Sequence, residues 1–189
     1  MNLVEDPRAA GSVRRYHTWA VIKDQTVAEH TWQILRILLT IWPTAPRNLL
    51  VYGLVHDMGE MSGDIQFPFK LMFNELRQGS EKAEVHVRGM QRKRLGAPDV
   101  KHPISQFERY VFKACDNLEM WEFSIRERNL GNMYANLMIA RMREAVAENM
   151  SNIYSLRDTQ QAQQNPDIVA NIQRYMKTRL EMESEVGQE

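Results

Sequence analysis

Apolar residues recur at spacings of three and four along most of the chain, which is the period of an amphipathic helix. No sustained two-residue alternation of the kind that marks a β-strand interrupts this pattern. The clearest stretch begins with a capping box, Thr26 and Glu29, and Pro43 stops it. Its apolar stripe consists of Ile34, Ile37, Leu38 and Ile41. The pattern therefore predicts an all-α fold.

The same signals predict the helices that follow in the middle of the chain. A second helix is expected to begin after Pro46 and to run to about Glu60. A short helix over residues 70–79 and another over 81–95, capped by Ser80, come next.

Three further helices are predicted in the second half. A long buried helix should begin at Ser105 and continue to about Gly131, and an amphipathic helix should cover residues 133–154. The last helix is expected to take Asn165 as its N-cap and Pro166 as its first residue, while residues 159–164 are expected to form a loop.

Length and charge limit the kinds of protein that this sequence can encode. The 189 residues fit one domain spanning 1–189, with the chemically informative motifs within about 12–125 and C-terminal helices over about 131–184. Lys plus Arg and Asp plus Glu both number 24, and this balance argues against a nucleic-acid polymer as partner. A small anionic ligand bound by a few local cations remains compatible with it.

Cysteine content and hydropathy indicate the compartment. Cys115 is the only cysteine, so neither an internal disulfide nor a zinc–thiolate cluster is possible. Apolar runs of 18 residues and a signal-peptide core are both missing. We therefore expect a cytoplasmic protein that does not associate with a membrane.

Four titratable side chains fall where the pattern predicts core. His30 shares the face of the first apolar stripe, and His56 faces inward from the second helix with Asp57 beside it. Asp116 lies inside an apolar stretch of the long helix, where an ionised carboxylate is costly unless a cation compensates it. Two histidines and two aspartates on three helices are a plausible cage for a divalent metal ion.

Each of these residues also has an ordinary structural interpretation. A single histidine on an apolar helix face is most often a hydrogen-bonded core residue, and Asp116 alone could be a capped or water-bound group. The order in which the four appear along the chain is what favours a shared site.

Four segments together resemble the HD-domain metal-dependent phosphohydrolases: VAEH (27–30), LVHDMGE (54–60), GDIQFPFK (63–70) and KACDNLE (113–119). More narrowly, the chain is similar to the small bacterial 5'-deoxynucleotidases and to the phage dATP triphosphohydrolases. The resemblance implies an HD-domain helical bundle. It also implies that the metal ligands are His30, His56, Asp57 and Asp116.

The resemblance assigns roles to further residues. Glu60 and Asp64 would activate water or protonate the leaving oxygen, and Lys70 and Lys113 would face phosphate. Arg15 and Tyr16 match an Arg–aromatic pair that contacts phosphate and base. Independently of the resemblance, Tyr16 and Trp19 offer flat faces for a base.

Nitrogen and oxygen donors of this kind suit one divalent transition metal, Zn²⁺, Co²⁺, Mn²⁺ or Fe²⁺, and a further divalent ion could accompany the phosphates. Arg14, Arg15 and Lys23 add to the local cations, although such residues are equally often solvated. The favoured substrate is a deoxynucleoside triphosphate, dATP first, cleaved to deoxynucleoside and triphosphate. A 5'-deoxynucleotidase acting on monophosphates is the alternative, and a non-catalytic HD-fold binding protein or helical interaction protein is the more distant one.

The resemblance also extends to assembly and source. The relatives form dimers or hexamers, so a homo-oligomer is expected. If the protein is viral, it would act in the cytoplasm of the host cell.

Overall fold

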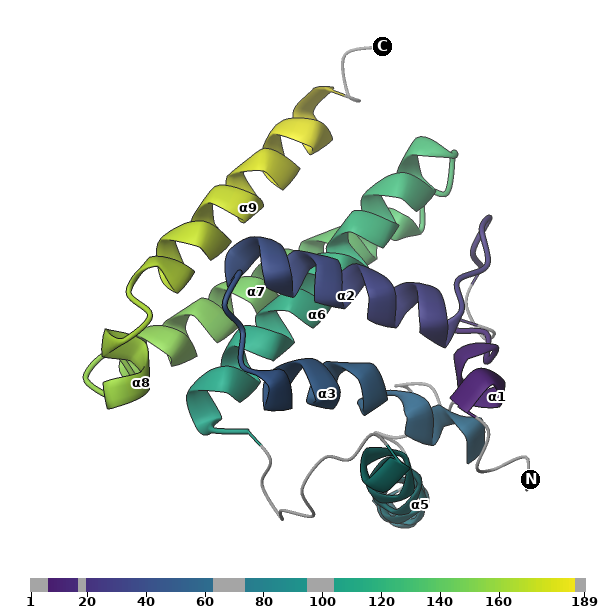
Figure 1. Cartoon of the computed structure of the whole chain (residues 1–189). Helices are drawn as coiled ribbons and strands as arrows, with labels where there is room; N and C mark the ends of the chain where they lie inside the picture. Colours follow the sequence, from purple (N-terminus) through teal and green to yellow (C-terminus); the bar gives the residue numbers. More distant parts are fainter. Residues whose placement is uncertain (1–6, 17–19, 63–73, 95–103, 186–189) are drawn as a thin grey trace. The chain divides into compact units, whose positions relative to one another are not determined.

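The computed structural model describes residues 7–16, 20–62, 74–94 and 104–185. Within these ranges the chain is helical and contains no β-strand, apart from one isolated bridge between Arg14 and Thr26 (Figure 1). The all-α prediction is confirmed. Across the same ranges, every helix is too short or too polar to cross a membrane.

Internal contacts divide the chain into two compact units. Unit 1 comprises Met1–Trp32 and Pro46–Pro103, and unit 2 comprises Gln33–Ala45 and Ile104–Glu189. The boundary passes through one helix, α2 (Val27–Ile41), which contributes its first residues to unit 1 and the remainder to unit 2. The prediction of a single domain stays a prediction.

Unit 1 is built around a short helix and the tight turn that follows it. Helix α3 (Arg47–Val55) leads into the 3₁₀ helix η2 (Met58–Ser62), and α5 (Asn74–Arg94) packs against both. Helix α1 (Pro7–Gly11) packs against η2.

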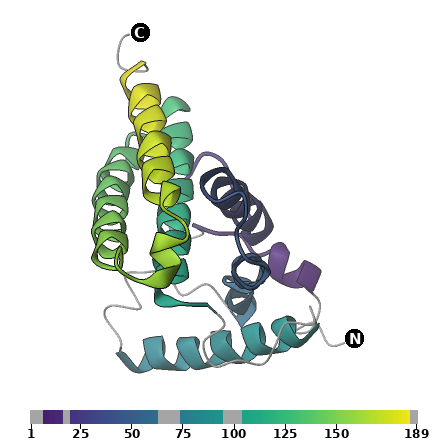
Figure 2. The same ribbon diagram turned by 60° about the vertical axis from the view of Figure 1, so that its left-hand side comes forward.

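Unit 2 is a group of three long helices with a short connecting helix. Helices α6 (Gln106–Asn129), α7 (Ala135–Ser155) and α9 (Asp167–Glu185) pack together, as Figures 1 and 2 show, and α8 (Gln160–Gln163) precedes α9. Trp121 and Leu118 on α6 and Ile172 on α9 are completely buried in this core.

Helix α2 begins and packs as the sequence predicts. Thr26 Oγ1 accepts a hydrogen bond from the Glu29 backbone N–H at 3.2 Å, and the Glu29 carboxylate accepts one from the Thr26 backbone N–H at 2.9 Å. This is the predicted capping box. The four residues of the predicted stripe are at most 1% exposed.

Helix α6 also follows its prediction. Ser105 is the N-cap and forms a capping box with Glu108. Beyond the end of the helix, Gly131 adopts φ 100°, a left-handed conformation that glycine reaches without a Cβ clash.

Other helix boundaries were predicted wrongly. The second helix does not stay α-helical to Glu60: α3 ends at Val55, and the chain tightens into η2. Residues 74–94 form one continuous helix, so Ser80 is not a cap. Gly79, next to it, costs an exposed helix only about 1 kcal/mol, too little to break α5.

The end of the chain departs from prediction in two places. Residues 160–163, expected to be loop, form the one-turn helix α8, with Thr159 Oγ1 accepting from the Ala162 backbone N–H. Helix α9 begins at Asp167, just after the predicted Pro166.

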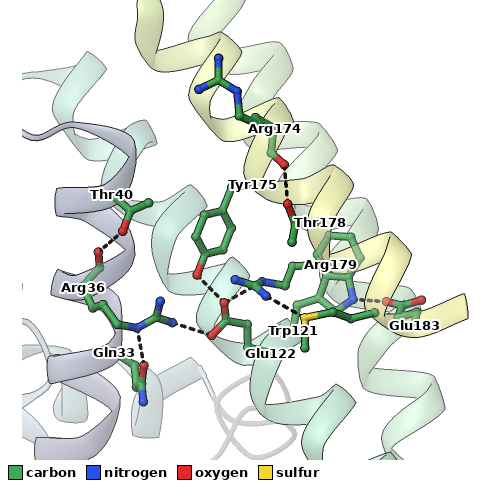
Figure 3. A network of polar contacts seen from close by, with 11 residues as sticks. Gln33, Arg36, Thr40, Trp121, Glu122, Arg174, Tyr175, Thr178, Arg179 and Glu183 are labelled. Carbon is green, nitrogen blue, oxygen red and sulfur yellow. Dashed lines mark hydrogen bonds and ion pairs between the residues drawn. The ribbon is translucent and has the colours of Figure 1, made fainter. Parts of the chain in front are cut away.

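A polar network ties α9 to α6 and to the C-terminal part of α2 within unit 2 (Figure 3). The Glu122 carboxylate accepts from Arg36 Nη2 at 2.7 Å, lies 2.7 Å from Arg179 Nε, and accepts from the Tyr175 hydroxyl. On the last turns of α9, Glu183 accepts from the Trp121 indole and pairs with Arg143.

Candidate metal centre

The two predicted histidine ligands are held by the helices that the sequence predicts for them. His30 lies one turn after the Thr26 cap and one turn before Ile34, so the apolar stripe of α2 draws its ring inward. His56 directly follows α3 and caps its C-terminal end. Both side chains are buried, His30 completely.

Both imidazoles converge on one carboxylate oxygen. His30 Nε2 lies 3.3 Å from Asp57 Oδ2, and His56 Nε2 lies 3.2 Å from the same atom. The two ring centroids are 5.5 Å apart. Unit 1 therefore brings together three of the four predicted ligands, although they come from two helices separated by a loop.

A backbone hydrogen bond determines which nitrogen of His56 faces Asp57. His56 Nδ1 is 2.7 Å from the Gly53 carbonyl oxygen, which can only accept, so Nδ1 carries the proton and donates. In the neutral ring, Nε2 then presents a lone pair to Asp57 Oδ2. Two lone pairs at this distance repel unless a second proton or a metal cation lies between them.

The Asp57 carboxyl is held in its ionised form. Burial by itself would raise the pKa of Asp57, but the imidazoles of His56 and His30 outweigh burial and hold this pKa well below its usual range. The charge attraction acts only while the imidazoles carry a second proton, so a metal ion that binds here would take the place of the Nε2 protons beside a carboxylate that is already ionised.

Arg88, on α5, supports this arrangement and was not predicted. Its Nη1 donates to the His56 carbonyl oxygen at 3.3 Å, at the point where α3 ends. No motif in the sequence marks Arg88. Only the packing of α5 against α3 and η2 shows its position.

Glu60 lies one 3₁₀ turn after Asp57. Its backbone N–H donates to the Asp57 carbonyl oxygen at 3.0 Å, and its side chain is half-buried. The predicted acid is therefore on the segment that carries the predicted carboxylate ligand, Asp57.

Arg15 and Tyr16 are held next to the start of α2 by backbone pairing. The Arg15 N–H donates to the Gln25 carbonyl at 2.8 Å, and Arg15 Nη1 donates to the Gln25 side chain at 3.2 Å. Tyr16 is buried and has φ 59°, the only positive φ of a non-glycine residue in the described ranges. That conformation costs roughly 1–2 kcal/mol, and the pairing around it sustains it.

The fourth predicted ligand, Asp116, belongs to unit 2. It is buried on α6, and its Oδ2 accepts from Lys113 Nζ at 2.6 Å, one turn earlier. Cys115 beside it is completely buried, as predicted for a small core residue. Burial, with a smaller contribution from the Asp116 charge, raises the pKa of the Cys115 thiol, so it is not an activated nucleophile.

Three predicted site residues lie outside the described residues: Trp19, Asp64 and Lys70. Their roles stay predictions.

The donor set of unit 1 fits a divalent transition metal. Two imidazole nitrogens and one carboxylate oxygen suit Zn²⁺, Co²⁺, Mn²⁺ or Fe²⁺, and the hydrogen bond from His56 to a backbone carbonyl is the usual support of a ligating histidine. No protein-family model matches the sequence, and no curated protein matches it significantly.

Proposed function

We propose that this protein is a divalent-metal-dependent phosphohydrolase of 2'-deoxynucleotides. The favoured reaction is hydrolysis of a deoxynucleoside triphosphate, dATP first, to deoxynucleoside and triphosphate. The observation that carries the proposal is the convergence of His30 Nε2 and His56 Nε2 on Asp57 Oδ2 within 3.3 Å, with the His56 tautomer set by Gly53. The choice of substrate rests on the sequence resemblance.

His30, His56 and Asp57 would hold the ion, and Asp116 is proposed as the fourth ligand on the strength of the sequence resemblance. When bound, a divalent ion supplies a water of lowered pKa and positive charge for the phosphoryl oxygens. With water as the attacking group, no nucleophilic side chain is needed, in keeping with the buried, protonated thiol of Cys115.

Departure of the nucleoside requires a proton on its 5' oxygen. Glu60 is proposed as the donor because it is half-buried and follows Asp57 by one turn. Asp64 is the second candidate for this role, from the sequence resemblance.

Recognition of the nucleotide is assigned to the segment before α2 and to nearby lysines. Arg15 would contact phosphate, and its guanidinium lies 5.1 Å from the centre of the Tyr16 ring. A left-handed backbone at a non-glycine residue, as at Tyr16, is typical of ligand-binding sites. Trp19 is proposed to contact the base, and Lys70 and Lys113 the phosphates.

One observation favours a deoxynucleoside monophosphate as the alternative substrate. Arg14 is paired with Asp24 at 3.0 Å, and Lys113 with Asp116 at 2.6 Å. These pairings lower the net positive charge available to a triphosphate, which carries close to four negative charges.

A single assay separates these substrates. The protein is incubated with each deoxynucleoside mono- and triphosphate in the presence of Mn²⁺ or Co²⁺, and the products are resolved by ion-exchange chromatography. Triphosphate from dATP supports the favoured reaction, and inorganic phosphate from the monophosphates supports the alternative. Failure of all substrates to react with metal-loaded protein would contradict the proposal.

A further inference from the structure

Two short segments of unit 1 pair antiparallel just before α2. An isolated β-bridge joins Arg14 to Thr26. Beside this bridge, the Arg15 N–H donates to the Gln25 carbonyl oxygen at 2.8 Å. Arg15 and Gln25 therefore lie directly opposite one another, and residues opposite in such a pair place their side chains on the same face.

The two neighbouring arginines lie on opposite faces of this pairing, because successive side chains of an extended chain alternate. The Arg14 side chain is 72% exposed and pairs with the Asp24 carboxylate at 3.0 Å. Arg15 is half-buried, and its guanidinium lies 5.1 Å from the centre of the Tyr16 ring. Of the two arginines, Arg15 is thus the one that packs against the protein.

Gln25 holds Arg15 at both ends of its side chain. The Gln25 carbonyl accepts from the Arg15 N–H, and Gln25 Oε1 accepts from Arg15 Nη1 at 3.2 Å. A guanidinium can only donate, so the oxygen of the Gln25 amide is the atom that faces it. Gln25 is 5% exposed, so the packing around it restrains this acceptor. A buried neutral amide fixes the direction of the guanidinium without adding a negative charge beside it.

We infer that Gln25 is a positioning residue for Arg15, and that it holds the guanidinium in the direction in which it binds the phosphate of the nucleotide. This inference rests on the proposed function, which assigns Arg15 to phosphate. An arginine side chain loses rotamer freedom when it binds an anion, and one that is already held loses less. Gln25 also directly precedes Thr26, the cap of α2, and His30 follows one turn later. Gln25 therefore places Arg15 relative to the helix that carries a proposed metal ligand.

The test is a double-mutant cycle on Arg15 and Gln25. Binding of inorganic tripolyphosphate, and of inorganic phosphate in parallel, to the metal-loaded protein is measured by isothermal titration calorimetry in excess Mg²⁺. Arg15→Gln should weaken binding about thirtyfold, because charge-assisted hydrogen bonds to phosphate are lost. Gln25→Met, similar in size but without the acceptor, should weaken it about tenfold. In the Arg15→Gln background, Gln25→Met should change binding by less than about twofold, because no guanidinium is left to position.

Further variants separate positioning from a general loss of structure. Gln25→Glu keeps an acceptor for the guanidinium and should bind within about threefold of wild type. Gln25→Asn keeps the amide but withdraws it by one methylene group, and should weaken binding as Gln25→Met does. Gln78→Met, an exposed change on α5 in the same unit, should bind like wild type. All variants should retain the metal ion in full by elemental analysis.

The outcomes distinguish this inference from the proposed function on which it rests. A wild-type chain that binds neither probe, or an Arg15→Gln variant that binds like wild type, would contradict the proposed phosphate contact and the inference with it. If Arg15→Gln weakens binding and the Met and Asn variants of Gln25 do not, the inference alone is overturned. An equal loss from Gln25→Met with and without Arg15 would also overturn it, because the effect would then not act through Arg15.

Discussion

At the scale of single residues, the state of the candidate metal centre depends on one hydrogen bond. The bond from His56 Nδ1 to the Gly53 carbonyl directs the other ring nitrogen at Asp57. Arg88 holds the His56 backbone from α5. Arg88 is thus a candidate positioning residue, because its described contact is with the backbone of a predicted ligand.

Replacing Arg88 should weaken metal binding without removing a ligand. We expect Arg88→Met to lower the affinity for Co²⁺ about tenfold, as is usual when support of a ligating histidine is lost. Affinity is measured by competition with a chelator. Lys82→Met, an exposed change on the same helix, should bind like wild type. Equal affinity of the Arg88 variant and wild type would show that Arg88 does not position His56.

The Cys115 thiol should be inert in the folded protein. It is completely buried, and burial raises its pKa, so little thiolate exists at pH 8. Labelling with 5,5'-dithiobis(2-nitrobenzoate) should be at least about a hundredfold slower in native buffer than in urea. Prompt labelling of the native chain would contradict the burial of this residue.

At the scale of the elements, caps define where the helices begin. The Ser105 hydroxyl accepts from the Glu108 backbone N–H at 3.1 Å and also donates to the Gln161 side chain on α8. Ser105→Ala should lower the free energy of unfolding by about 1 kcal/mol, measured by urea denaturation. Ser155→Ala, an exposed serine at the end of α7, should change it by less than about 0.5 kcal/mol.

The same elements show how far the sequence predicts the fold. Thr26 with Glu29 marks the start of α2 because a capping box is a purely local interaction. The end of α3 was missed because its change to 3₁₀ geometry depends on packing of η2 against α5 and α1. Ser80 resembles a cap, yet the neighbouring exposed Gly79 costs too little to end a long helix.

The residues of the candidate site also fall into those that a local sequence pattern predicts and those that only the packed structure shows. His30 and His56 could be predicted because helical period places both on apolar faces. Arg88 acts on a residue 32 positions earlier through a backbone carbonyl, and this contact leaves no sequence pattern. The left-handed Tyr16 likewise depends on pairing with residues beyond the following loop.

At the scale of the whole molecule, unit 2 owes part of its stability to the network around Glu122 (Figure 3). The Glu122 carboxylate pairs with Arg36 and Arg179 and accepts a hydrogen bond from Tyr175. It therefore joins α6 to α2 and α9. Burial, together with the hydrogen bond to Glu122 and its charge, raises the pKa of Tyr175, although Arg179 opposes this. The folded chain therefore favours the protonated phenol.

This preference predicts a specific loss of stability in alkali. Because the folded pKa of Tyr175 exceeds the unfolded value near 10, its contribution is complete below about pH 10 and is lost as the pH rises through the folded pKa. Tyr175→Phe should cost about 1 kcal/mol at pH 7, and its stability should fall less steeply than that of wild type above about pH 10. If the free energy of unfolding fell equally steeply with pH in both proteins, the pKa of Tyr175 would be the same in the folded and the unfolded chain.

The central claim, that His30, His56 and Asp57 bind a divalent metal ion, is tested most directly by equilibrium dialysis. Wild type dialysed against micromolar Zn²⁺ or Co²⁺ should retain about one ion per chain by elemental analysis. Asp57→Asn, nearly identical in size, should retain less than about a tenth of that. Asp24→Asn, an exposed carboxylate in the same unit, should bind like wild type. A wild-type chain that retains no ion, or an Asp57→Asn variant that retains a full equivalent, would contradict the account.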